Sequence, residues 1–155
     1  MNKKTTSSFL IILSFFIYSC GFTPQYAGFK NLEFDLVIDQ INGDRDFNNE
    51  IKSQIKRYDR DRKDIEKIKI SYESNYEKVI LSKNTKGEAT KYNLTVNVIF
   101  DIKSESYSTK IEFNDEFSID KIDDTIEENN YIKIVKRNFA ERAIEKLILS
   151  IRQNK

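Results

Sequence analysis

The segment that decides the fold is Tyr92-Asn93-Leu94-Thr95-Val96-Asn97-Val98-Ile99-Phe100-Asp101-Ile102. Apolar side chains occupy its even-numbered positions, and polar side chains occupy all but one of its odd-numbered positions. Because successive side chains of a β-strand point to opposite faces, this pattern predicts a strand with one buried face and one wet face. Such strands are typical of an antiparallel sheet that is covered on one side only.

Three other segments alternate in the same way and predict three further strands. Their apolar positions are Phe34, Leu36 and Ile38 in the first, Ile68, Ile70 and Tyr72 in the second, and Ile111, Phe113, Phe117 and Ile119 in the third. The second segment resumes with the opposite parity at Val79 and Leu81, which predicts a β-bulge between Tyr72 and Val79. Turns are predicted at 42–43, 83–87 and 104–108, where Asn, Gly or Ser gather.

Helical spacing predicts two helices. In the first, Phe47, Ile51, Ile55 and Tyr58 lie on one face, and Asp44 or Asp46 is the expected N-cap. The second begins at 125–128, where Thr-Ile-Glu-Glu matches a capping box. Its broad apolar stripe consists of Ile132, Val135, Phe139, Ala140, Ala143, Ile144, Leu147, Ile148 and Ile151.

Together these elements predict an α+β fold of the order β-α-β-β-β-α. We expect a four-stranded, mostly antiparallel sheet with both helices packed on one face, while the other face is polar and either open or covered by a partner. The length of 155 residues fits one domain. This domain is predicted at 20–155 and includes a short N-terminal tether at 20–31.

Composition excludes several classes of function. The chain has 26 Lys and Arg against 25 Asp and Glu, so a nucleic-acid partner is not expected. It has no His, which excludes Ser-His-Asp and Cys-His mechanisms and disfavours a zinc or iron site. Its four scattered Gly residues form no phosphate-binding loop motif. We therefore expect a protein that is not an enzyme and that needs no metal or cofactor.

The first nineteen residues are predicted to be a signal peptide. Two lysines precede the apolar run 9–18, which is too short to cross a bilayer. The run ends in Ile17-Tyr18-Ser19-Cys20, which resembles the bacterial lipobox. This resemblance implies cleavage before Cys20 and acylation of Cys20 with chains such as palmitate. The alternatives are a plain signal peptide with an incidental Cys, or an uncleaved anchor.

The N-terminal sequence also implies a location. In enteric bacteria an Asp after the lipidated Cys retains a lipoprotein at the inner membrane, and Gly21 stands at that position here. The lipobox resemblance therefore implies sorting to the outer membrane. Stable anchoring needs more than one acyl chain, which a multiply acylated Cys20 would supply.

Several features together resemble the LptE-type lipopolysaccharide-assembly lipoproteins, in their alphaproteobacterial branch. They are the lipobox, the stretch Cys20-Gly21-Phe22-Thr23-Pro24-Gln25-Tyr26, the alternating strand at 92–100, Asn138-Phe139-Ala140 in the last helix, and the order of elements. The resemblance implies a lipoprotein on the periplasmic side of the outer membrane. It would plug a large LptD-type β-barrel, help the barrel to assemble, and help to deliver lipopolysaccharide to the cell surface.

The contact residues for lipopolysaccharide do not carry over from the resemblance. Lys83, Lys86 and Lys91 near the predicted hairpin are candidates for contact with an anionic ligand by location only. Their alternative interpretation is ordinary solvated charge.

Two other functions remain open at the level of sequence. One is a lipid-tethered periplasmic binding or chaperone module without a barrel partner, which would bind a peptide along an exposed sheet edge or a soluble ligand. The other is a small hydrolase with paired carboxylates in a cleft.

Overall fold

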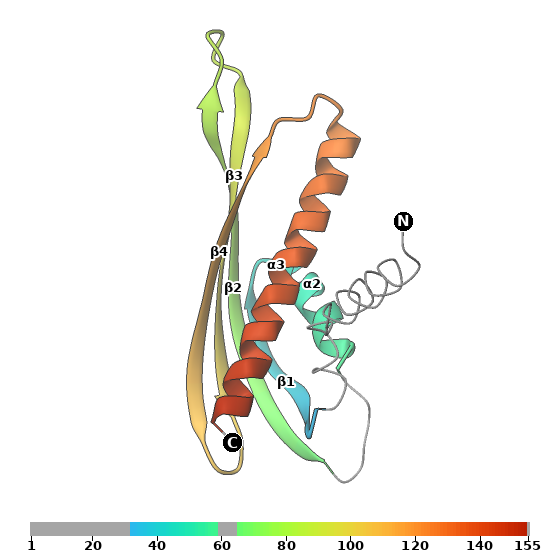
Figure 1. Ribbon diagram of the computed structural model, residues 1–155, viewed down its shortest axis with the longest axis vertical. Coiled ribbons are helices and arrows are strands. Elements are labelled where there is room, and N and C mark those ends of the chain that lie inside the picture. The colour runs from blue at the N-terminus through green and yellow to red at the C-terminus, as the bar shows by residue number, and fades with distance from the viewer. Residues whose placement is uncertain (1–31, 59–64, 155) are drawn as a thin grey trace, which may run out of the picture. The chain divides into compact units, whose positions relative to one another are not determined.

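The computed structural model describes residues 32–58 and 65–154, which belong to one compact unit. Its elements are β1 (Phe34–Gly43), α2 (Arg45–Lys56), β2 (Glu66–Lys83), β3 (Ala89–Lys103), β4 (Ser108–Asp120) and α3 (Thr125–Gln153). The four strands form one sheet in the order β1-β2-β3-β4. Strand β1 runs parallel to β2, and the other two pairs are antiparallel. The predicted α+β fold and element order are confirmed (Figure 1).

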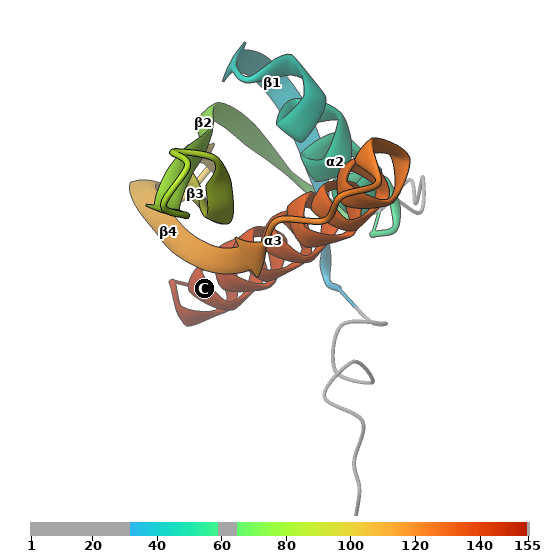
Figure 2. The same ribbon diagram turned by 90° about the horizontal axis from the view of Figure 1, so that it is seen from above.

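The core lies between the sheet and the two helices, which cover the same face of the sheet (Figure 2). Strand β3 contributes the buried side chains Leu94, Val96, Val98, Phe100 and Ile102, as its alternation predicted. Helix α3 contributes Val135, Phe139, Ala140, Ala143, Ile144, Leu147, Ile148 and Ile151. Burial of these apolar surfaces fixes which face of each element points inward.

Polar contacts join the end of β1 to the start of α2 and to β2. The carboxylate of Asp44 accepts a 2.7 Å hydrogen bond from the N–H of Phe47, so Asp44 is the N-cap of α2. The buried amide of Asn48 donates to the carbonyl of Asn42 at 3.1 Å and accepts from the hydroxyl of Ser74 at 2.8 Å. A buried amide that lacked these partners would destabilise the fold. The hydrogen bonds among Asn42, Asn48 and Ser74 therefore fix the orientation of α2 relative to the end of β1.

The predicted capping box of α3 is wrong by one residue. Asp124, not Thr125, is the N-cap, and its carboxylate accepts hydrogen bonds from the N–H groups of Ile126 and Glu127 at 2.8 and 3.0 Å. Glu128 instead accepts from Lys78 of β2 at 2.6 Å and from the N–H of Ile122 at 3.2 Å. This glutamate therefore ties the start of α3 to the sheet.

The predicted bulge between Tyr72 and Val79 is also wrong. Strand β2 pairs with β3 in unbroken register from Lys69 to Ile80, and the register shifts only between Ile80 and Lys83. The apolar pattern changes parity at Val79 because this residue lies on the open face, opposite Asn93, where its side chain is 47% exposed. The sequence pattern therefore indicated a bulge only because an apolar residue lies on the solvent-exposed face.

Candidate functional site

The predicted lipid-attachment residue Cys20 and the sorting residue Gly21 lie outside the described residues, as do the signal peptide and the tether. In the described part of the chain, no helix is long and apolar enough to cross a membrane. Within that same part, no group of three or more His, Cys, Asp or Glu side chains is placed to hold a metal ion.

The three candidate lysines all lie near the end of the β2–β3 hairpin, which extends beyond the end of β4 (Figure 1). Lys83 ends β2, Lys86 lies in the turn, and both are exposed. Lys91 lies on β3 and forms a 3.4 Å ion pair with Asp120 of β4. Two of the three lysines are thus open to solvent, while the third already faces a carboxylate.

The turn that carries Lys86 is held by the side chain of Asn84. Its carbonyl oxygen accepts from the N–H of Lys86 at 2.9 Å and from the N–H of Glu88 at 3.0 Å. Gly87 completes the turn with φ +85°, a conformation that glycine adopts without steric cost. The sequence signal for this hairpin therefore has a clear structural basis.

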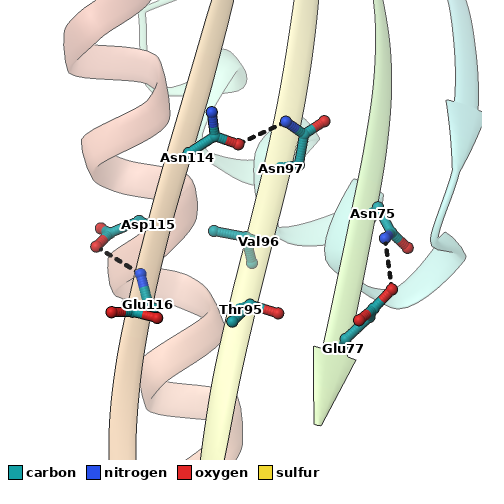
Figure 3. A pocket seen from close by; sticks show the side chains of 8 residues that line it. All are labelled: Asn75, Glu77, Thr95, Val96, Asn97, Asn114, Asp115 and Glu116. Carbon is teal, nitrogen blue, oxygen red and sulfur yellow. Dashed lines mark hydrogen bonds between the residues drawn. The ribbon is translucent and has the colours of Figure 1, made fainter. Parts of the chain in front are cut away.

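The open face of the sheet carries a polar ladder that runs across β2, β3 and β4. We use the name asparagine–glutamate ladder for Asn75, Glu77, Asn93, Asn97, Glu112, Asn114 and Glu116. Asn75, Asn97 and Asn114 are in cross-strand register, and Glu116 lies opposite Thr95 beside them. Alternation along the strands places all of these side chains on the face away from the helices. Figure 3 shows five of them: Asn75, Glu77, Asn97, Asn114 and Glu116.

Members of the ladder hydrogen-bond mainly to one another. The amide of Asn97 donates to the carboxylate of Glu112 at 2.9 Å, and that of Asn114 donates to the same carboxylate oxygen at 3.0 Å. Asn93 donates to Glu116 at 3.2 Å. Hydrogen bonds from Asn114 and Asn97 hold the pKa of Glu112 below its usual value. This glutamate is therefore a poor general acid.

A shallow hollow of about 480 Å³ lies over this ladder. It is lined by Asn75, Glu77, Thr95, Val96, Asn97, Asn114, Asp115 and Glu116 (Figure 3). The lining therefore consists mainly of amides and carboxylates. Its chemistry suits a polar partner surface, whereas an anionic ligand would meet like charge here.

Two tyrosines on the helix-facing side of β2 have structural surroundings. Burial raises the pKa of Tyr72 to about 12, and its hydroxyl donates to the carbonyl of Asn48 at 3.4 Å. Burial, followed by the nearby charge of Asp44, raises the pKa of Tyr76 to about 12. The ring of Tyr76 packs under the ammonium of Lys136 at 3.9 Å. Both phenols stay protonated at neutral pH, which fits a packing role.

No family model matches the chain, and no curated protein matches its sequence. Its fold is similar to that of rare lipoprotein B from Shewanella oneidensis, with a TM-score of 0.50 and 13% identity over 75% of this chain and 98% of that one. The chain shares the fold of that lipoprotein.

Two other solved lipoproteins are similar as well. Lipoprotein B from Nitrosomonas europaea gives a TM-score of 0.49 and 12% identity over 74% of this chain and 82% of that one. A minor lipoprotein from Acinetobacter baumannii gives 0.47 and 12% identity over 72% of this chain and 93% of that one.

Proposed function

We propose that this chain is an outer-membrane lipoprotein that plugs an LptD-type β-barrel, helps it to assemble, and helps to deliver lipopolysaccharide to the cell surface. It would be anchored on the periplasmic side through Cys20 and would act without catalysis. The lipobox and the fold shared with rare lipoprotein B support this proposal.

The observation that carries the proposal is the asparagine–glutamate ladder. The interior of an outer-membrane barrel is polar, so a domain inside it needs a polar surface that loses little when bulk water is displaced. Side chains that already hydrogen-bond to one another, as Asn97 does to Glu112, meet this requirement. An apolar open face would instead favour burial against another apolar surface.

Cross-linking on strand β3 tests the partner directly. Ile99 lies on the open face opposite Glu73 and Glu112, whereas its neighbour Val98 is fully buried. A photoreactive aliphatic amino acid of similar size is placed at each position in turn, in the full chain expressed in its host. After irradiation, the tagged protein is purified from solubilised outer membranes and its cross-linked products are identified by mass spectrometry.

We expect one large β-barrel protein, in one-to-one ratio, to be cross-linked from position 99 and not from position 98. Without irradiation, the same barrel should copurify with the chain in high salt, because an extensive contact is screened less than a few surface ion pairs. Recovery of the acylated chain alone from both variants would contradict the plug proposal. It would favour the lipid-tethered binding or chaperone module.

A further inference from the structure

A second hollow lies on the helical side of the molecule, between α2 and α3, and its volume is about 600 Å³. Both helices stand side by side in the two views (Figures 1 and 2). Ser53 and Arg57 line it from the side of α2, four residues apart, while Asn130, Lys133 and Arg137 line it from α3. Residues spaced by three or four positions lie on the same face of a helix. One face of each helix therefore presents these side chains to the same groove.

Three cations line this groove, namely Arg57, Lys133 and Arg137. Several cations have bonded partners: Lys78 with Glu128, Lys91 with Asp120, Lys110 with Asp101, Arg142 with Asp115, and Lys146 with the carbonyl of Glu112. Within the described residues, no ion pair or side-chain hydrogen bond is made by Arg57, Lys133 or Arg137. Glu50 also lines the groove, so these four groups leave a net charge of +2.

We propose that the α2–α3 groove binds a phosphate monoester. Guanidinium groups match the oxygens of a phosphate in a forked geometry, and an ammonium adds a point charge. A phosphate monoester carries a charge of about −1.5 to −2 at neutral pH, which complements the groove. The hydroxyl of Ser53 and the amide of Asn130 supply neutral donors, and the hollow has room for the organic part of the ligand. This site does not depend on the proposed barrel partner.

Two probes with the same headgroup test the site and separate its possible sources. Glycerol 3-phosphate represents a soluble phosphate compound, and dihexanoyl phosphatidic acid represents a lipid headgroup. Each is titrated into the full chain in dodecyl maltoside, and its dissociation constant is measured by calorimetry. Amide NMR shifts of Ser53 and Asn130 in the labelled protein report where the probe binds.

The test variant carries Arg57→Gln, Lys133→Gln and Arg137→Gln, all at exposed positions. Lys133 and Arg137 lie within α3, where glutamine preserves helix propensity. The matched control carries Lys69→Gln, Lys103→Gln and Lys121→Gln, which remove the same charge from exposed positions outside the groove. We expect the groove variant to bind at least one probe about tenfold more weakly than wild type, and the control variant to bind about as wild type does.

Equal affinity for the two probes would identify a soluble phosphate compound, and tighter binding of phosphatidic acid would identify a lipid headgroup. Absence of binding at millimolar probe, or binding that the control variant weakens and the groove variant does not, would overturn the proposal. Unchanged melting temperatures show that both variants are folded. The result is independent of the cross-linking experiment, since that experiment probes the opposite face.

Discussion

Replacing Gly43 by alanine tests how the parallel β1–β2 pair is closed. Gly43 ends β1 with φ +96°, and it lies opposite Ser74 of β2. A Cβ at this position would lie 1.8 Å from the carbonyl oxygen of Ser74. That oxygen also accepts a 3.0 Å hydrogen bond from the N–H of Asp44, the N-cap of α2. The two backbones must separate before a methyl group fits.

The structure sets the expected magnitude through a matched pair of glycines. A left-handed conformation costs an L-residue about 1–2 kcal/mol. Loss of the hydrogen bond to the buried Ser74 carbonyl costs about 1–3 kcal/mol more. We therefore expect Gly43→Ala to lower the free energy of unfolding by about 3 kcal/mol or more. Gly87 has φ +85°, but a Cβ added there would meet no atom of the described residues within 4 Å, so Gly87→Ala should cost only about 1 kcal/mol.

Urea unfolding of the full chain, followed by circular dichroism, measures both losses. The dependence of the free energy on urea should be the same in the two variants, because neither changes the extent of the folded domain. Equal destabilisation by the two alanines would refute the reasoning. It would mean that only the backbone conformation matters and that the close approach to Ser74 contributes nothing.

Four further substitutions test other contacts. Asp124→Ala should lower the free energy of unfolding by about 1 kcal/mol, and Thr125→Ala should lower it by only a few tenths of a kcal/mol, because Asp124 caps α3. Equal losses of stability, measured by urea unfolding, would contradict this assignment. The hydrogen bond from Lys78 lowers the pKa of Glu128. The stability that this bond contributes is therefore present above the ordinary glutamate pKa, and it is lost as the pH falls through the lowered pKa of Glu128. Glu128→Gln should flatten the acid limb of stability against pH in thermal unfolding, and an unchanged limb would count against the contact. Phe139→Ala should lower the free energy of unfolding by about 3–5 kcal/mol, as measured in urea, because Phe139 is fully buried. A loss of less than about 1 kcal/mol would exclude Phe139 from the core.

The fold was predictable where periodicity and burial agree. Strand β3 alternates without exception on its buried side, and the register of both neighbouring strands follows from it. The predicted bulge failed because periodicity does not distinguish a change of register from an apolar side chain on the wet face, as at Val79. The cap of α3 was misplaced because Asp124 and Thr125 are adjacent and both are good caps, so only the path of the chain selects between them.

The candidate sites were harder to predict because they depend on packing between distant segments. The sequence drew attention to Lys83, Lys86 and Lys91, which are close along the chain. Arg57 is far in sequence from Lys133 and Arg137, and only the packing of α2 against α3 brings the three to one groove. Helical spacing showed that each helix has a polar face, but no pattern in one sequence indicates which polar faces meet.

The two faces of the domain therefore differ in chemistry and can act independently. On the open face, carboxylates such as Glu112 already accept hydrogen bonds from neighbouring amides, so a polar partner could cover them without leaving them unsatisfied. In the helical groove, Arg57 and Arg137 retain donors and positive charge that a bound anion would satisfy. Because the sheet lies between the two surfaces, a partner on the ladder would leave the groove accessible from the other side. Phosphate binding should accordingly persist when the open face is occupied.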